Sequence, residues 1–120
     1  MAGSVVHIEL PSSDADRAVG FWNGLFGWGI GGSAMEGFDY RMAQIGPEQG
    51  VAVFPSPDTA GKGAIVYFST DDNDASLARV RELGGSAEEK QAVPKTGWFA
   101  SCNDTEGNSF SLWQMDESAG

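Results

Sequence analysis

The sequence is poor in positive charge, and this shortage excludes several classes of partner. Its 120 residues include 7 Lys and Arg against 17 Asp and Glu, for a formal net charge of −10. A chain this acidic, with no basic cluster, gains nothing from counterion release on DNA or RNA. It is also repelled by anionic membrane surfaces. We therefore expect neither nucleic-acid binding nor membrane association.

The chain also lacks crosslinking side chains and long apolar runs. Its one cysteine, Cys102, cannot form an intrachain disulfide. No apolar stretch approaches the roughly 20 residues that a membrane helix needs, and the first residues lack the basic and apolar segments of a signal peptide. These absences favour a cytoplasmic location. The hydrophobic fraction of 41% is typical of a folded domain, and the length fits one domain, 1–120.

Apolar spacing predicts two helices, and alternation predicts the strands around them. The first helix contains apolar residues from Ala15 to Phe26, follows the cap candidates Ser12, Ser13 and Asp14, and ends at Gly27. The second contains Leu77, Val80 and Leu83 and ends at Gly84 and Gly85. We expect strands over 5–10, 38–45, 51–54, 64–68, 87–93, 97–102 and 109–114, a short Gly-rich strand within 28–34, and a frayed tail over 116–120.

An internal repeat is the main organising signal. A shift of 57 residues aligns the two halves without a gap and places Ile8 on Ile65, Ser12 on Ser69 and Gly27 on Gly84. Strands, helix starts and helix ends then match one another. The sequence therefore predicts an α+β protein of two βαβββ modules, about 1–57 and 58–120.

Two segments of the chain resemble a known family. They are His7-Ile8-Glu9-Leu10 with the following 17–28, and Trp98-Phe99-Ala100 with the following 104–113. They are similar to the opening and the ending of vicinal oxygen chelate proteins, which include glyoxalase I, bleomycin-resistance proteins and extradiol dioxygenases. The resemblance implies a cupped mixed sheet with helices on its outer face and, in many members, homodimers. It does not imply one chemistry, because members of one fold differ in function.

Strand alternation assigns side chains to two faces of the expected sheet. The face under the helices would carry the consistently apolar set Ile8, Leu10, Val51, Val53, Ile65, Tyr67, Phe110 and Leu112. The opposite face would carry the mixed set His7, Glu9, Ala52, Phe54, Ala64, Val66, Ser109, Ser111 and Trp113. A mixture of imidazole, carboxylate, hydroxyl and aromatic groups suits a ligand pocket.

The resemblance also locates the metal-ligand positions of family enzymes, one on the first and one on the last strand of each module. These positions hold His7, Phe54, Ala64 and Ser111. Only His7 ligates a divalent metal well, whereas such sites need three or four good donors. We therefore expect no metal site and no cofactor.

Two functions remain open for the expected pocket. The first is metal-free binding of a small organic molecule, as in bleomycin-resistance proteins, with His7, Phe54, Trp98, Ser111 and Trp113 as ligand contacts. The acidic charge is compatible with a cationic ligand. The second is a lyase, isomerase or cyclase of the superfamily that uses His7 or Glu9 as acid or base, or a glyoxalase-like lyase with a displaced metal site. A third reading, an accessory protein without pocket chemistry, is also open.

Several single residues have plain structural interpretations. His7 is either a ligand contact or a neutral imidazole hydrogen-bonded to Glu9 or the backbone. Cys102 is interpreted as a small core residue and Trp22 as a core residue, whereas Trp28 is a further pocket candidate. Apolar edges and aromatic surface on a sheet of this length also predict a homodimer, because monomers rarely expose large apolar patches.

Overall fold

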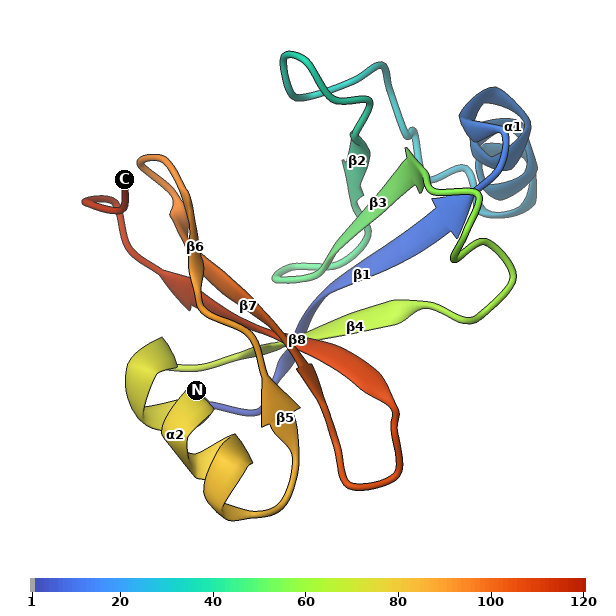
Figure 1. The fold of residues 1–120 in the computed structure, drawn as a ribbon. Coiled ribbons are helices and arrows are strands. Elements are labelled where there is room, and N and C mark those ends of the chain that lie inside the picture. The colour runs from blue at the N-terminus through green and yellow to red at the C-terminus, as the bar shows by residue number, and fades with distance from the viewer. Residues whose placement is uncertain (1) are drawn as a thin grey trace. The chain divides into compact units, whose positions relative to one another are not determined.

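The computed structural model describes residues 2–120, which form two compact units (Figure 1). The first is His7–Ile65, and the second combines Val66–Gly120 with the start of the chain up to Val6. The elements are β1 (Val5–Ser12), α1 (Ala15–Phe26), β2 (Arg41–Gln44), β3 (Gly50–Pro55), β4 (Ile65–Ser69), α2 (Asn73–Glu82), β5 (Ser86–Ala87), β6 (Gln91–Val93), β7 (Gly97–Asn103) and β8 (Ser109–Met115). Within residues 2–120, no helix is long and apolar enough to cross a membrane.

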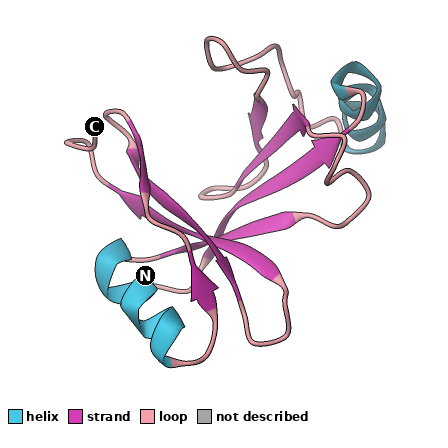
Figure 2. Ribbon diagram, in the orientation of Figure 1, coloured by secondary structure: helices cyan, strands magenta, loops and turns pink. Residues whose placement is uncertain are grey.

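The predicted α+β fold is confirmed, with a strand, a helix and further strands following one another twice (Figure 2). Two of the predicted strands form fewer strand pairings than expected. The Gly-rich segment after α1 contributes only a bridge between Ser33 and Arg41. The segment 87–93 is divided into β5 and β6, which both pair with β7.

In the first unit, α1 packs on one face of a three-stranded mixed sheet. β3 lies between β1, which is parallel to it, and β2, which is antiparallel. The buried core joins Ala15 and Ile30 to Val51 and Val53, which are fully buried. Asp14 caps the helix by accepting a hydrogen bond from the Arg17 amide. The helix ends at Gly27, whose φ of 65° lies in the left-handed region that glycine favours.

In the second unit, α2 packs on a sheet in which β8 lies between β4 and β7. β4 is parallel to β8, and β7 is antiparallel to it. The core cluster contains Leu77, Ala100, Cys102 and Leu112. Asp72 caps α2 by accepting a hydrogen bond from the Ala75 amide.

The face assignment from the sequence is right for the first unit but wrong for β4. Leu10, Val51 and Val53 pack under α1, as predicted. In β4, however, Phe68 packs with the α2 cluster, and Tyr67 points to the opposite face. The 57-residue shift matches Leu10 with Tyr67. In the structure, however, Leu10 pairs with Val53 in the first unit, whereas in the second unit Phe68, one residue after Tyr67, pairs with Leu112. A slip of one residue exchanges the two faces of a strand.

The chain end was predicted to fray, and this is wrong. The Asp116 amide donates to the Thr96 carbonyl, and the Lys95 amide donates to the Ala119 carbonyl. Ala119 is buried. The tail is therefore tied to the loop between β6 and β7.

Candidate functional site

Three polar side chains in the first unit form one hydrogen-bonded series. The hydroxyl of Tyr40 donates to Glu9 Oε2 over 2.7 Å. His7 Nε2 lies 2.8 Å from the same hydroxyl oxygen. Because the single phenolic proton is given to Glu9, the His7 bond must be donated by Nε2–H. The structure therefore joins both residues that were predicted as acid or base, through a tyrosine that the prediction omitted.

The segment before β2 positions Tyr40. Its amide donates to Ser33 Oγ over 3.0 Å, and its carbonyl accepts from the Ala34 amide over 2.8 Å. On either side, Asp39 and Arg41 form an ion pair at 2.9 Å, and Arg41 also bonds Asp16 of α1. The Arg41 guanidinium lowers the pKa of Asp39 by hydrogen bonding. These contacts hold Asp39 and Arg41 together while the ring between them lies against His7.

Aromatic rings surround the tyrosine on the face opposite α1. The ring centroids of Phe38 and Phe54 lie 5.8 and 6.0 Å from that of Tyr40, and 6.1 Å from each other. Phe38 is 44% exposed, and Met42, in register with Ala52 beside Phe54, is also exposed. We call Phe38, Tyr40, Met42 and Phe54 the aromatic face. Its signal in the sequence is the alternation of residues 38, 40 and 42, which the face assignment left out.

Burial sets the protonation of His7. Desolvation lowers its pKa from 6.5 to about 4, so the imidazole is neutral at pH 7. Gly50 lies opposite His7 in the register of β1 and β3, and a Cβ at Gly50 would lie 2.9 Å from His7 Nδ1. Glycine at this position is therefore needed to seat the ring. The interpretation of His7 as a neutral, hydrogen-bonded imidazole agrees with this geometry, with the Tyr40 hydroxyl as its partner where Glu9 or the backbone was expected.

The second unit carries its own face opposite the helix. Tyr67 is paired with Ser111 in register, and Phe99 with Trp113. The rings of Tyr67 and Phe99 have centroids 6.5 Å apart. Ser111 is buried, and Trp113 is half-buried beside Gly97. Ser111 and Trp113 thus lie on the face that the sequence predicted for them, whereas Tyr67 and Phe99 are additions from the structure.

Trp98 does not lie on that face, so its predicted ligand contact does not fit the structure. It is in register with Gln114, whose Oε1 accepts from the amide of Asn73 at the start of α2. The indole Nε1–H donates to Asp116 over 3.0 Å, and the Lys90 ammonium lies 4.4 Å from the ring centroid. Because alternate residues of β7 point to opposite faces, Phe99 takes the place predicted for its neighbour.

The packing of Cys102 and Trp28 decides between a core position and a pocket position for each of them. Cys102 is buried in the α2 cluster, where desolvation raises the pKa of its thiol, so the core interpretation is confirmed. Trp28 stacks on Trp22 at a centroid distance of 5.2 Å and packs against the α1 core. The prediction of Trp28 as a pocket residue does not fit this placement.

The residues present do not fit a divalent metal. Among residues 2–120 no group of three or more His, Cys, Asp or Glu side chains could hold one. Because of the one-residue difference in β4, the residue that corresponds to His7 in the second unit is Ile65 and not Ala64. Neither side chain has an atom that could ligate a metal. Phe54 packs among aromatic rings, and Ser111 offers only a hydroxyl. His7 and Glu9 are both bound by Tyr40.

Removal of metal ions should therefore leave the protein unchanged. We expect dialysis against EDTA to alter neither the thermal midpoint nor the near-UV circular dichroism, because no folding energy comes from a bound ion. Elemental analysis of the untreated protein supplies the control. One zinc, nickel or iron ion held per chain, with a lower midpoint after EDTA, would contradict this expectation.

Comparison with known proteins agrees with this fold. A family model described as a glyoxalase-like domain matches residues 6–113. A glyoxylase-like domain-containing protein of Didymella fabae is 30% identical over 120 residues, covering 92% of each chain. The anthracycline biosynthesis protein DnrV of Streptomyces peucetius is 31% identical over 129 residues, covering 93% of this chain. The chain spans 47% of the length of that second relative.

Solved structures show the same architecture at lower sequence identity. A methylmalonyl-CoA epimerase variant of Streptomyces coelicolor, in complex with 2-nitronate-propionyl-CoA, superposes with a TM-score of 0.76 at 18% identity. The match covers 100% of this chain and 99% of the epimerase. At this identity the likeness establishes the fold alone.

Proposed function

The chain belongs to the glyoxalase-like domain family of the vicinal oxygen chelate superfamily, and we propose that it binds a planar organic molecule on its aromatic face. The observation that carries the proposal is the cluster of three rings, Phe38, Tyr40 and Phe54, in which each ring contacts the other two. Exposed aromatic planes offer a large contact area to flat ligands. The Tyr40 hydroxyl, placed between His7 and Glu9, adds a polar group that orients the ligand.

The charge of the site favours a ligand with a cationic group. Glu9 brings a carboxylate beside the rings, and the whole chain has a net charge of −10. A cation is attracted both by a carboxylate and by aromatic faces. One relative is an anthracycline biosynthesis protein, which supports planar polycyclic compounds as the first probes. We therefore propose an amine-bearing polycyclic aromatic ligand.

The test is a calorimetric titration with an anthracycline and with its neutral aglycone. We expect the amine-bearing compound to bind more tightly. Phe54→Ala should weaken binding about tenfold, which is about 1.4 kcal/mol, because it removes one ring from the face. Tyr40→Phe should weaken binding while keeping the ring stack, since it removes only the hydroxyl.

A matched control is available at Leu83, the C-terminal cap of α2. Leu83→Ala removes another exposed apolar side chain, one that lies outside the aromatic face, and it should leave the affinity unchanged. Equal affinity in Phe54→Ala, Tyr40→Phe and the original protein would refute the proposed face. Loss of binding in Leu83→Ala alone would place the ligand elsewhere.

A second candidate function is proton transfer by the His7–Tyr40–Glu9 series. The series favours this role because its hydrogen bonds run in one direction from His7 to Glu9. A general base is most effective with a pKa near the working pH, and the pKa of His7 is about 4. Binding is therefore the better-supported function. Solvent deuterium exchange into a bound ligand, lost in His7→Gln, would favour the enzyme.

A further inference from the structure

A hollow lies beside the first half of α1, on the helix side of the first unit. Its volume is about 460 Å³, and its lining residues are Ser12, Ser13, Asp14, Arg17, Ala18, Phe21, Trp22 and Ala60. Small-molecule sites have volumes of roughly 300–1,000 Å³. None of the lining residues belongs to the aromatic face or to the His7–Tyr40–Glu9 series, so the hollow is a separate candidate site.

Two segments of the first unit form the walls of this hollow. One wall is the start of α1, where residues four apart follow one another along the helix in two rows. The rows are Ser13, Arg17 and Phe21, and Asp14, Ala18 and Trp22. The other wall is the loop after β3, in which the Ser56 amide donates to the Ser12 carbonyl over 2.7 Å and the Ala60 amide donates to the Ser56 carbonyl over 2.9 Å. These bonds hold Ala60 at the end of β1, and its methyl group leaves the hollow open.

One end of the hollow carries a cation beside an anion. Arg17 Nη1 lies 3.8 Å from Asp14 Oδ2, and the two side chains are 73% and 49% exposed. Arg17 Nη2 also donates to Ser13 Oγ over 3.2 Å, and Asp14 Oδ1 accepts from the Arg17 amide over 3.1 Å. An exposed ion pair contributes little to stability. Both charges can therefore turn to a ligand at little cost to the fold.

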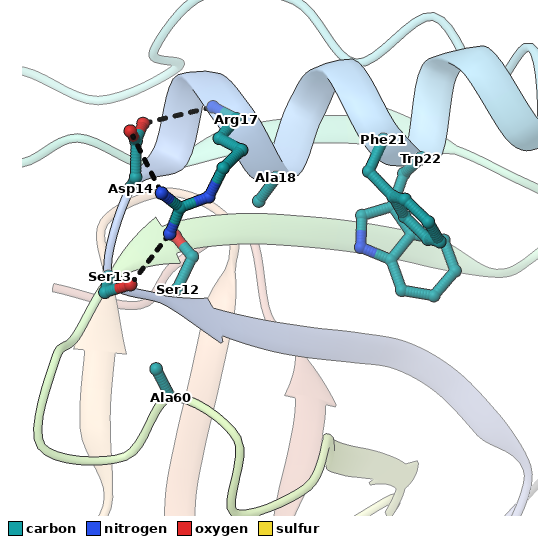
Figure 3. Close-up of a pocket in the computed structure, with 8 residues that line it drawn as sticks. All are labelled: Ser12, Ser13, Asp14, Arg17, Ala18, Phe21, Trp22 and Ala60. Atoms are coloured by element: carbon teal, nitrogen blue, oxygen red, sulfur yellow. Dashed lines mark hydrogen bonds and ion pairs between the residues drawn. The ribbon is translucent and has the colours of Figure 1, made fainter.

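The other end of the hollow is aromatic. Phe21 is 61% exposed and lies edge to face with Trp22, at a centroid distance of 5.1 Å and an interplanar angle of 89°. Figure 3 shows Ala18 between this pair of rings and the charged end. The Cβ atoms of residues four apart on a helix are about 5–6 Å from one another. The charges and the rings are thus separated by about the length of one amino-acid side chain.

From these features we propose that the hollow binds a free amino acid with an aromatic side chain. The α-carboxylate meets the Arg17 guanidinium, which suits carboxylates because it donates paired hydrogen bonds. The α-ammonium meets the Asp14 carboxylate, and the side chain lies against Phe21 and Trp22. A ligand with one charge would place that charge beside a like charge, on Asp14 or on Arg17, whereas a zwitterion matches both.

The experiment is an NMR titration of the ¹⁵N-labelled protein with L-phenylalanine at millimolar concentration. The comparison ligands are N-acetyl-L-phenylalanine, which lacks the ammonium group, and phenethylamine, which lacks the carboxylate. We expect phenylalanine to shift the amide signals of Ala18 and Ala60 and to bind at least about tenfold more tightly than either analogue, because each analogue loses one charged contact.

Three substitutions test the separate parts of the hollow. Asp14→Asn keeps the helix cap, since asparagine caps as well as aspartate, and should weaken phenylalanine binding about tenfold but not the binding of N-acetylphenylalanine. Arg17→Gln should weaken phenylalanine to the same extent and leave phenethylamine unaffected. Ala60→Leu should weaken all three ligands because it fills the hollow. Arg79→Gln is the matched control and should change nothing, since Arg79 is in an exposed ion pair on α2.

The proposal is overturned if phenylalanine shifts no signal at millimolar concentration, or if it binds no better than its two analogues. It is also overturned if Arg79→Gln weakens binding as much as Arg17→Gln, or if Ala60→Leu binds phenylalanine as the original does. Anthracycline binding should be unchanged in Arg17→Gln, and phenylalanine binding should be unchanged in Phe54→Ala. The aromatic face and the hollow beside α1 can therefore fail separately.

Discussion

Acidification from pH 6.5 to about 4 should reduce the free energy of unfolding by about 3 kcal/mol through His7 alone. The unfolded chain binds a proton at the ordinary histidine pKa of 6.5, whereas burial delays protonation of the folded chain until about 4. Between these values the unfolded state holds more protons. Stability is therefore fully present above pH 6.5 and is lost as the pH falls through this window.

The measurement is urea unfolding at a series of pH values, with His7→Gln as the comparison. The glutamine amide can still donate to the Tyr40 hydroxyl but does not titrate. This chain has one histidine, so subtraction of the two curves isolates its contribution. Hydrogen bonds lower the pKa values of Asp39, Asp104 and Asp116 from 3.8. The stability that these carboxylates contribute is therefore lost at a lower pH than the stability that His7 contributes. Parallel curves for both proteins would show that His7 titrates normally when folded.

The fold could be predicted because its signals are local or repeated. Asp14 and Gly27 mark the ends of α1 as expected from capping chemistry alone. Gly84 repeats the positive φ of Gly27 at the end of α2. Such signals depend on the backbone of a few neighbouring residues, so no tertiary contact is needed to recognise them.

The faces of β4 and β7 could not be predicted because both depend on register. In β4, Val66, Tyr67 and Phe68 are all apolar, so alternation cannot choose between the two faces. The 57-residue shift gave the wrong face for β4. It matches the glycines that follow the two helices, Gly27 and Gly84, but the residues that cap the helix starts, Asp14 and Asp72, are 58 residues apart. In β7, Trp98 and Phe99 are adjacent aromatic residues of similar hydrophobicity. Only the pairing with Gln114 and Trp113 decides which of them points away from α2.

Only part of the candidate site could be predicted from the sequence, namely His7 and Glu9 but not Tyr40. His7 and Glu9 stand out as polar residues on a β-branched strand, and their parity is unambiguous. Tyr40, which joins them, is 31 residues from Glu9 and lies just before β2. Its position depends on the Ser33 hydroxyl and on the ion pair of Asp39 and Arg41. The alternation of residues 38, 40 and 42 indicates the face of Tyr40, but the hydrogen bonds that join it to Glu9 and His7 span 31 and 33 residues and depend on tertiary packing.

Substitution of Gly97 by alanine should be among the most damaging small changes in the chain. Gly97 is buried at the start of β7, in register with Met115 of β8. A Cβ there would overlap the carbonyl oxygen of Gln114 and lie 2.7 Å from Cζ2 of the Trp113 indole. The carbonyl belongs to a strand backbone that cannot withdraw without opening the β7–β8 ladder. Overpacking of this kind costs about 2–3 kcal/mol.

Gly20→Ala supplies a control of the opposite sign. Its Cβ would meet nothing within 4 Å, so the change should stabilise the helix by about 0.5–1 kcal/mol. Urea unfolding of both variants, at concentrations where the chain is monomeric, compares the two effects directly. Gly97→Ala should also shift the Trp113 near-UV signal, because the indole lies where the new methyl group must go. A Gly97→Ala protein as stable as the original would mean that the Trp113 ring is not held against β7, and Trp113 would then lose its fixed place on the face opposite α2.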